Sequence, residues 1–173
     1  MAPPIMVRSP HLTLIPLTLA MMRAAGADRA GLSAALSARI PDDWPQTDLA
    51  EALPLFADLL AADPAHYPWF VWVIVKVSDA VVAGDIGFRG PPKDRETVEL
   101  GYSVLPAFRR QGIAGEAAAT LVAWLRARPE ARLLIAHTEP GNLISQRVLR
   151  RLGMRERVMQ DGEIRWELPI GPA

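Results

Sequence analysis

The segment from Trp69 to Val77 constrains the fold most strongly, because it is an almost unbroken run of aromatic and β-branched residues. Such a run is typical of a β-strand that is covered on both faces. A second candidate strand, Val81–Arg89, follows, and the turn-forming segment Gly90–Arg95 leads into a third, Thr97–Val104. The last two strands are therefore expected to form an antiparallel hairpin.

Two helices are expected before these strands. The alternation of apolar and polar residues in His11–Leu17 predicts a half-buried first strand, and helical patterns follow over Asp28–Arg39 and about Asp48–Ala62. The proline-containing segment 41–45 ends the first of these helices. The second helix is expected to bury one apolar face, formed by Leu49, Leu53, Phe56, Leu59 and Leu60.

Strands and helices alternate after the hairpin. The patterns predict, in order, a helix over Gly112–Arg128, a strand over Leu133–Thr138, a helix over Asn142–Leu152 and a final hairpin over Met154–Leu168 that turns at Asp161–Gly162. No internal repeat or low-complexity linker divides the chain. We therefore expect an α/β (α+β) fold in a single domain that spans residues 1–173.

Charge and cysteine content argue against several functions. Nineteen Lys and Arg residues balance nineteen Asp and Glu residues, so no net field attracts nucleic acid or an anionic membrane. The absence of cysteine excludes disulfides, thiolate metal sites and a cysteinyl acyl intermediate. The run Leu12–Met22 is similar to the apolar core of a signal peptide, but Pro16 interrupts it. We expect a cytoplasmic protein without a membrane span.

The histidines and the one serine motif do not predict a hydrolase or a metal site. His11, His66 and His137 lie far apart and lack His-Glu-x-x-His spacing. His137 falls within an apolar strand, where a hydrogen-bonded core histidine is expected. Gly101–Ser103 is similar to a nucleophile elbow, but Leu105 replaces the second glycine of that motif.

The segment 98–117 predicts a phosphate-binding junction, because a strand meets a basic turn that contains glycine and then a long helix. Unpaired backbone N–H groups and the helix dipole favour an anion at such a helix start. Gly112, Ala114 and Gly115 leave room for it, and Arg109 and Arg110 supply countercharge. The alternative is a tight strand-to-helix crossing in which the glycines only pack.

Two blocks of the sequence resemble a known family. The pattern Arg109-x-x-Gly112-x-Ala114 resembles the Arg/Gln-x-x-Gly-x-Gly/Ala signature of the GNAT superfamily of N-acetyltransferases. The segment from Glu139 to Met154, with Asn142 and Ser145, resembles the Asn-x-x-Ser helix of that family. The resemblance covers about residues 70–168. It is strongest to the branch with the ribosomal-protein alanine acetyltransferases (RimJ/RimL-like), whose members are similar to this chain in segments 87–92 and 98–103.

The resemblance implies a twisted, mostly antiparallel sheet that is splayed near Val104, with helices on both faces and acetyl-CoA in the splay. No metal is implied. The residues that the resemblance assigns to the cofactor are Val104, Leu105, Arg109, Arg110, Gln111, Gly112, Ile113, Ala114, Gly115, Asn142 and Ser145. Asn142 has an alternative role as the N-cap of its helix.

The resemblance also implies direct transfer of the acetyl group to an amine. Glu99 is the candidate base; the alternative is a solvent-facing or salt-bridged glutamate. Backbone N–H groups near Val104 and Leu105 are expected to stabilise the oxyanion. Leu149 stands where many relatives carry a tyrosine acid, so Ser145 is the candidate to protonate the leaving thiolate.

Two further hypotheses stay open at this point. A non-catalytic acyl-CoA-binding module would keep the junction without turnover, and a structural protein would use its glycines only for packing. The acceptor amine is a protein N-terminus or a small molecule, and the protein is a monomer or homodimer. Four aromatic residues either line the acceptor pocket or belong to the core: Trp44, Trp69, Phe70 and Trp72.

Overall fold

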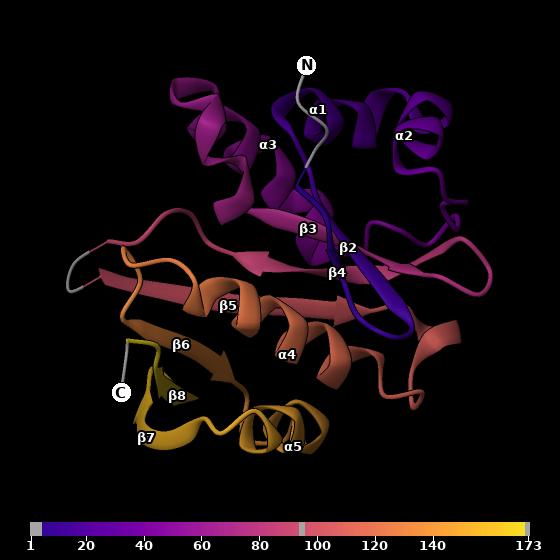
Figure 1. The fold of residues 1–173 in the computed structure, drawn as a ribbon. Coiled ribbons are helices and arrows are strands. Elements are labelled where there is room, and N and C mark those ends of the chain that lie inside the picture. Colours follow the sequence, from indigo (N-terminus) through magenta and orange to yellow (C-terminus); the bar gives the residue numbers. More distant parts are fainter. Residues whose placement is uncertain (1–4, 94–95, 172–173) are drawn as a thin grey trace.

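A single eight-stranded sheet runs through the computed structural model, which describes residues 5–93 and 96–171 (Figure 1). The strand order is β1-β2-β3-β4-β5-β6-β8-β7. The strands are β1 Val7–Arg8, β2 Leu12–Pro16, β3 Val71–Lys76, β4 Val81–Phe88, β5 Thr97–Val104, β6 Leu133–Thr138, β7 Arg155–Gln160 and β8 Glu163–Pro169. All neighbours are antiparallel except β5 and β6, which are parallel. This confirms the mixed, mostly antiparallel sheet that was predicted.

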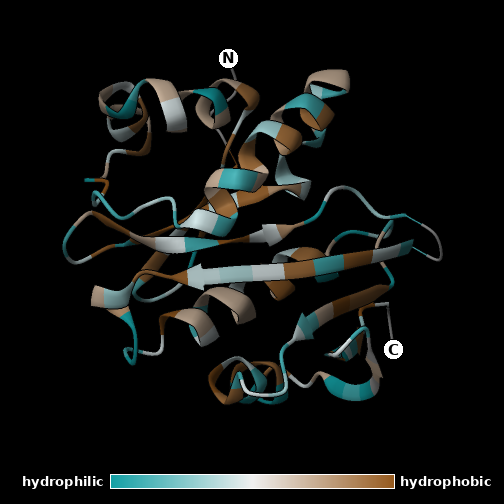
Figure 2. Cartoon of the chain, turned by 180° about the vertical axis from the view of Figure 1, so that it is seen from behind, coloured by the Kyte–Doolittle hydropathy of each residue, from teal (hydrophilic) through white to brown (hydrophobic). Residues whose placement is uncertain are grey.

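Helices lie on both faces of the sheet (Figure 1). The helices are α1 Leu19–Ala27, α2 Arg29–Leu36, α3 Thr47–Ala62, α4 Ile113–Arg126 and α5 Leu143–Arg151, with short 3-10 segments η1 Pro64–Trp69 and η3 Pro106–Phe108. On the α4 face, the Trp124 ring centroid lies 5.4 Å from that of Trp69 and 5.2 Å from that of Trp72. In Figure 2 hydrophobic residues occur on strands and helices alike, and core residues such as Val73 of β3 are fully buried.

The opposite face of the sheet receives the chain that leads into α3. There the indole N–H of Trp44 donates to the carboxyl of Asp85 on β4, with Nε1 to Oδ2 at 3.1 Å. Because side chains alternate along a strand, Asp85 and Gly87 face this side, whereas Ile86 and Phe88 face α4. Within the described ranges, no helix is both long and apolar enough to cross a membrane.

Most helices and strands lie where they were predicted from the sequence. β6 has the predicted bounds. α4 and α5 start directly after their N-caps, Gly112 and Asn142. The last hairpin turns where expected, with positive φ at both Asp161 (51°) and Gly162 (82°), as a two-residue turn of this kind needs. The predicted turn Gly90–Arg95 ends at residues 94 and 95, which lie outside the described residues.

The early helices differ from the prediction in number and length. Helix α1 was not expected, because the prediction placed a strand over His11–Leu17 and began the first helix at Asp28. Its start is set by Thr18, whose hydroxyl accepts from the Met21 backbone N–H at 3.3 Å. Helix α2 ends at Leu36, earlier than predicted, because Ser37 adopts a left-handed conformation with φ of 50°.

The buried face of α3 is narrower than predicted. Leu53 and Leu60 are buried, but Leu59 is 51% exposed. Successive helical residues point about 100° apart, so a face that buries Leu60 turns Leu59 outward. Pro54 lies inside this helix and removes a backbone donor there.

Candidate active site in the splay between two parallel strands

The parallel pairing of β5 with β6 is short and leaves an opening beyond it. Residues Thr97–Glu99 pair with Leu133–Ile135, and the strands then part, earlier along β5 than the predicted position at Val104. A cavity of about 820 Å³ lies at the opening. Of the predicted site residues, four line this cavity: Glu99, Arg109, Asn142 and Ser145.

The backbone of β5 presents free polar groups to the splay. Leu105 N–H donates to the Ala83 carbonyl at 2.9 Å, and Arg89 N–H donates to the Glu99 carbonyl at 3.2 Å. In an antiparallel ladder these bonds recur at alternate residues, so the odd-numbered residues of β5 bond to β4. The N–H groups of Tyr102 and Val104 therefore point the other way, into the splay. Leu105 is not available as an oxyanion donor, which corrects the expectation for that residue.

The start of α4 has the features of an anion site. Gly112, its N-cap, has φ of 77°, and no side chain in the described part of the chain caps the helix. The first backbone N–H groups of a helix lack intrahelical acceptors. A Cβ added at Gly112 or Gly115 would meet nothing within 4 Å, so open space lies over both. The side chain of Ile113 points into the core, so only its backbone N–H can contact an anion at the helix start.

The basic turn before α4 is held by its own side chains. Arg109 Nε donates to the Val104 carbonyl at 3.0 Å, and Gln111 Nε2 donates to the Ala107 carbonyl at 3.2 Å. Arg110 is exposed, with φ of 61°, and has no ionic partner in the part of the chain that the structure describes. Its charge is therefore available to an anion at the helix start.

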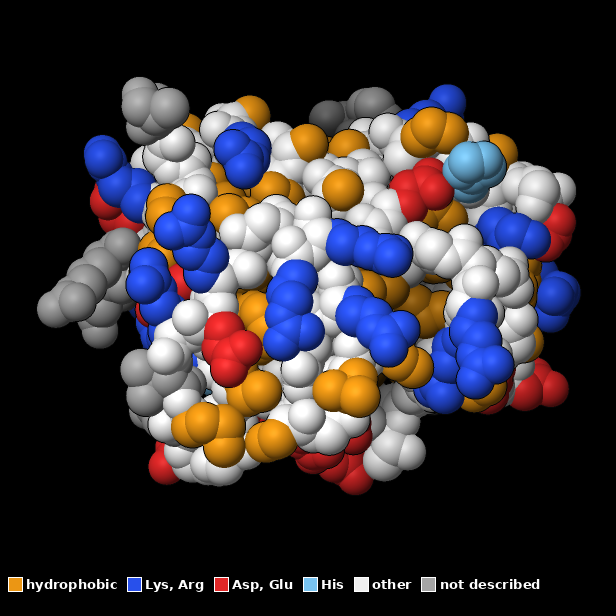
Figure 3. All heavy atoms as spheres, turned by 90° about the horizontal axis from the view of Figure 1, so that it is seen from below, with side chains coloured by type: hydrophobic (Ala, Val, Ile, Leu, Met, Phe, Trp, Pro, Cys, Tyr) orange, Lys and Arg blue, Asp and Glu red, His pale blue; other side chains and the backbone are white. Residues whose placement is uncertain are grey.

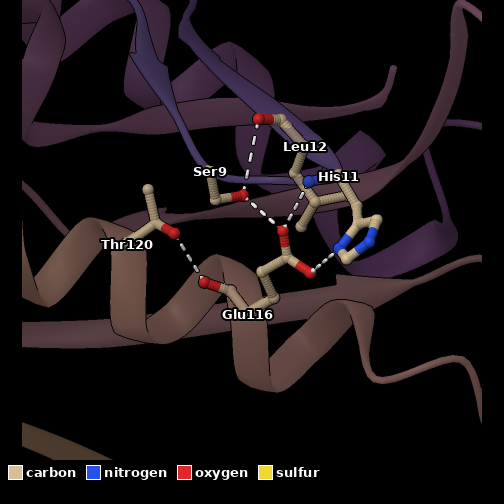
Figure 4. Close-up of polar contacts among 5 residues, drawn as sticks. All are labelled: Ser9, His11, Leu12, Glu116 and Thr120. Atoms are coloured by element: carbon tan, nitrogen blue, oxygen red, sulfur yellow. Dashed lines mark hydrogen bonds and ion pairs between the residues drawn. The ribbon is translucent and has the colours of Figure 1, made fainter. Parts of the chain in front are cut away.

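Glu116, in the first turn of α4, is drawn away from this anion site. Its carboxylate accepts from Ser9 Oγ at 2.5 Å, from the His11 backbone N–H at 2.9 Å, and lies 3.0 Å from His11 Nδ1 (Figure 4). Burial acts to raise the pKa of Glu116, but these bonds from Ser9 and His11 outweigh it and hold the pKa below its usual value. The contacts tie the β1–β2 turn to α4.

The start of α5 forms the far wall of the splay. Asn142 Oδ1 accepts from the Ser145 backbone N–H at 3.1 Å, so Asn142 is the N-cap of α5, which is one of the two roles predicted for it. Asn142 also lines the cavity. The Tyr102 hydroxyl donates to the Ser145 carbonyl at 3.4 Å. Burial raises the pKa of Tyr102, and the bond to Ser145 opposes it. Leu149 also lines the cavity, at the position where relatives were expected to carry a tyrosine.

Glu99 forms a cluster at the point where the strands part. Its Oε1 lies 3.1 Å from His137 Nδ1 on β6 and 3.2 Å from Arg89 Nε. Both contacts use Oε1, and Oε2 has no partner within the described residues. His137 was expected to be a core histidine, and it is hydrogen-bonded, but it lines the cavity. Glu99 thus combines the salt-bridged alternative with a position in the site.

A second carboxyl, that of Asp85 on β4, lies in the cavity away from Glu99. Asp85 is 7% exposed and lines the cavity. Its Cα partner on β5 is Ser103, whose hydroxyl is hydrogen-bonded to the Gln46 side chain. Burial raises the pKa of Asp85 to about 7, although the bond from Trp44 acts in the opposite direction. This carboxyl was missed, yet the sequence carried a signal: it is the one charged residue of β4.

The four aromatic candidates have different positions. Phe70 lines the cavity, and Trp44 holds the carboxyl of Asp85. Trp69 and Trp72 belong to the core beneath α4. No cluster of three or more potential metal ligands occurs in the described ranges.

Arginines gather on the face that α5 forms, seen from below in Figure 3. Helix α5 contributes Arg147, Arg150 and Arg151. Arg150 pairs with Glu156 at 3.6 Å. Arg147 and Arg151 are exposed and have no ionic partner among the residues described. This face adds positive charge beside the splay, which favours a ligand with several negative charges.

The chain is similar to known acetyltransferases. The family model described as "Acetyltransferase (GNAT) domain" matches residues 12–155. An "uncharacterized N-acetyltransferase YjdG" from Bacillus subtilis is 33% identical over 111 residues, which are 64% of this chain. The matched stretch spans 66% of that relative, just under two thirds of its length.

Solved structures share the fold at low identity. RimJ from Mycobacterium smegmatis, in complex with CoA-disulfide, has a TM-score of 0.64 at 19% identity, over 96% of this chain and 86% of that one. A ribosomal-protein-S5-alanine acetyltransferase from Vibrio fischeri has a TM-score of 0.63 at 14% identity, over 95% and 96%. These likenesses support the fold alone.

Proposed function

The chain belongs to the GNAT family of acetyltransferases, and from this we propose that it transfers an acetyl group from acetyl-CoA directly to a primary amine. The observation that carries the proposal is the splay itself. An uncapped helix start with open glycines lies at one end, and a carboxylate that lines the cavity lies where β5 and β6 part. The amine belongs to a protein N-terminus or a small molecule, and the protein acts as a monomer or homodimer.

The first turn of α4 is suited to the pyrophosphate of acetyl-CoA. The N–H groups at Gly112, Ile113, Ala114 and Gly115, together with Arg109, Arg110 and Gln111, are the proposed contacts. The N–H of Val104 serves the pantetheine arm. Tyr102 N–H lies closer along β5 to Glu99, so it is better placed to stabilise negative charge on the carbonyl oxygen of the thioester.

The transfer needs one proton acceptor and one proton donor. The amine nitrogen bonds to the thioester carbon, the carbon–sulfur bond breaks, and Glu99 takes a proton from the nitrogen through Oε2, directly or through water. Arg89 and His137 orient Glu99 through Oε1. Ser145 protonates the departing sulfur. A shared cavity supplies proximity, so no acyl-enzyme is needed.

The experiment that tests the proposal measures Tm with and without acetyl-CoA, because a ligand that binds only the folded state raises Tm. Gly115→Leu should remove the rise by filling the open space over the helix start. Gly26→Leu is the matched control, since a Cβ at Gly26 also meets nothing within 4 Å, but Gly26 lies in α1. Thiol release with a panel of amines then tests transfer.

The results separate the candidate functions. A rise that Gly115→Leu abolishes and Gly26→Leu keeps, followed by amine-dependent thiol release, supports the transferase. A rise without thiol release for any amine or peptide N-terminus would favour the non-catalytic acyl-CoA-binding module. No rise at saturating acetyl-CoA would remove the proposal.

A further inference from the structure

Asp85 is a buried carboxyl that has no countercharge among the residues that the structure describes. It is 7% exposed, and its pKa is set by burial and by the Trp44 bond, with no contribution from a Lys, Arg or His of the described chain. Trp44 occupies Oδ2. An ionised carboxyl in such a place is costly unless a cation pairs with it. A cation that enters the cavity would therefore gain a strong partner here.

The free oxygen of this carboxyl is open to the cavity. Oδ1 has no hydrogen-bond partner among the residues that the structure describes, and it is not sealed off as the unpaired indole nitrogen of Trp124 is. Asp85 is a cavity-lining residue. The neighbouring polar side chains, Gln46 and Ser103, bond to each other through Ser103 Oγ and Gln46 Oε1.

The position of Asp85 relative to the proposed transfer site fixes a distance. Asp85 pairs with Ser103, next to Tyr102 on β5. Gly101, between Glu99 and Ser103 on the same face, carries no side chain, and a Cβ there would meet nothing within 4 Å. Asp85 and the position over Gly101 are separated by one strand spacing across the sheet and by one or two residues along β5. Together these give a separation of roughly 5–10 Å. A short linear molecule can reach both.

We propose that Asp85 binds a second, protonated nitrogen of the acceptor, so that the substrate is a small diamine or polyamine rather than a monoamine. This inference rests on the proposed function and names the substrate class for it. The amine that reacts lies over Gly101, within reach of Glu99, while the ammonium at the other end pairs with Oδ1 of Asp85. Trp44 keeps the carboxyl oriented through Oδ2.

The test compares α,ω-diamines from propane- to hexanediamine with n-alkylamines of equal chain length. We expect kcat/KM at least about ten-fold higher for the best diamine than for its matched monoamine. Asp85→Asn keeps an acceptor oxygen for Trp44 and removes the charge. It should reduce the preference to less than about three-fold, with the KM for acetyl-CoA unchanged. Asp48→Asn, an exposed carboxyl that lines the same cavity, should retain the preference.

A binding measurement separates this inference from the proposed function. The best diamine alone should raise the Tm of the wild-type protein more than the monoamine does, and Asp85→Asn should remove that difference. Equal use of diamine and monoamine by the wild type, acetylation of peptide N-termini only, or a preference that survives in Asp85→Asn would each overturn the inference while acetyl transfer stands. Absence of an acetyl-CoA-induced rise in Tm would instead overturn the proposed function and this inference with it.

Discussion

Glu99, which with Ile135 forms the last parallel pair of β5 and β6, has its Oε1 3.1 Å from Nδ1 of His137, two residues further along β6. The two residues thus bridge the point where the sheet opens. Because Arg89 contacts the same oxygen, the cluster fixes the carboxylate and leaves Oε2 for the substrate. This geometry makes Glu99 the first residue to test.

We expect Glu99→Gln to lower kcat roughly 10²–10³-fold, because the amide cannot accept the proton from the amine. The acetyl-CoA-induced rise in Tm should be unchanged, since the change does not touch the start of α4. Glu163→Gln is the matched control, an exposed glutamate that also lines the cavity, and it should keep at least half of the rate. Steady-state kinetics with a fixed amine checks this, and an unimpaired Glu99→Gln would assign the base elsewhere.

His137 should act through Glu99 rather than on the substrate. His137→Ala is expected to lower kcat about ten-fold in the wild-type background and less than about two-fold in Glu99→Gln, because residues in one network are not additive. The double-mutant cycle in kcat is the measurement. Equal effects in both backgrounds would mean that His137 has a separate, structural role.

Two hydroxyl-bearing residues that line the cavity, Ser145 and Tyr102, are candidates to protonate the leaving sulfur, and their substitution distinguishes them. Ser145→Ala should lower kcat about ten-fold with little change in KM. Tyr102→Phe should lower it less than about two-fold, because the tyrosine hydroxyl is directed at the Ser145 carbonyl. The reverse ranking would assign the proton to Tyr102.

The sequence predicted elements best where local rules act alone. Gly112 and Asn142 mark helix starts, and Asp161–Gly162 marks a turn, because each depends on the conformation of a few neighbouring residues. The candidate Glu99 came from a family resemblance. Asp85 and His137 were missed as site residues, because their roles depend on Trp44 and Glu99, which are distant in the sequence. The role of Leu105 depends on the register between β4 and β5, because its backbone N–H donates to the Ala83 carbonyl and is not free for a ligand.

Asp85 should make stability fall as pH rises. Its folded pKa of about 7 lies above the ordinary value of 3.8, so the folded state binds more protons between these values, and each pH unit in that window costs up to about 1.4 kcal/mol. Asp85→Asn lacks this dependence. Urea unfolding at pH 4, 6 and 8 should show that the free energy of unfolding of Asp85→Asn increases relative to that of the wild type as pH rises. A difference independent of pH would contradict the raised pKa.

Glu116 should have the opposite dependence. Its folded pKa lies below the ordinary value, so the stability that it contributes is present above about pH 4.5 and is lost as pH falls through the folded pKa. Glu116→Gln weakens the bonds to Ser9 and His11 and should lower Tm at pH 7 by about 3 °C, equivalent to roughly 1 kcal/mol for a solvent-screened contact. Below the folded pKa the wild type and variant should converge, because the wild-type carboxyl is then protonated too. Glu130→Gln, a glutamate without an ionic partner among the described residues, should show no difference at either pH. A gap that persists at low pH would mean that packing, and not charge, joins the β1–β2 turn to α4.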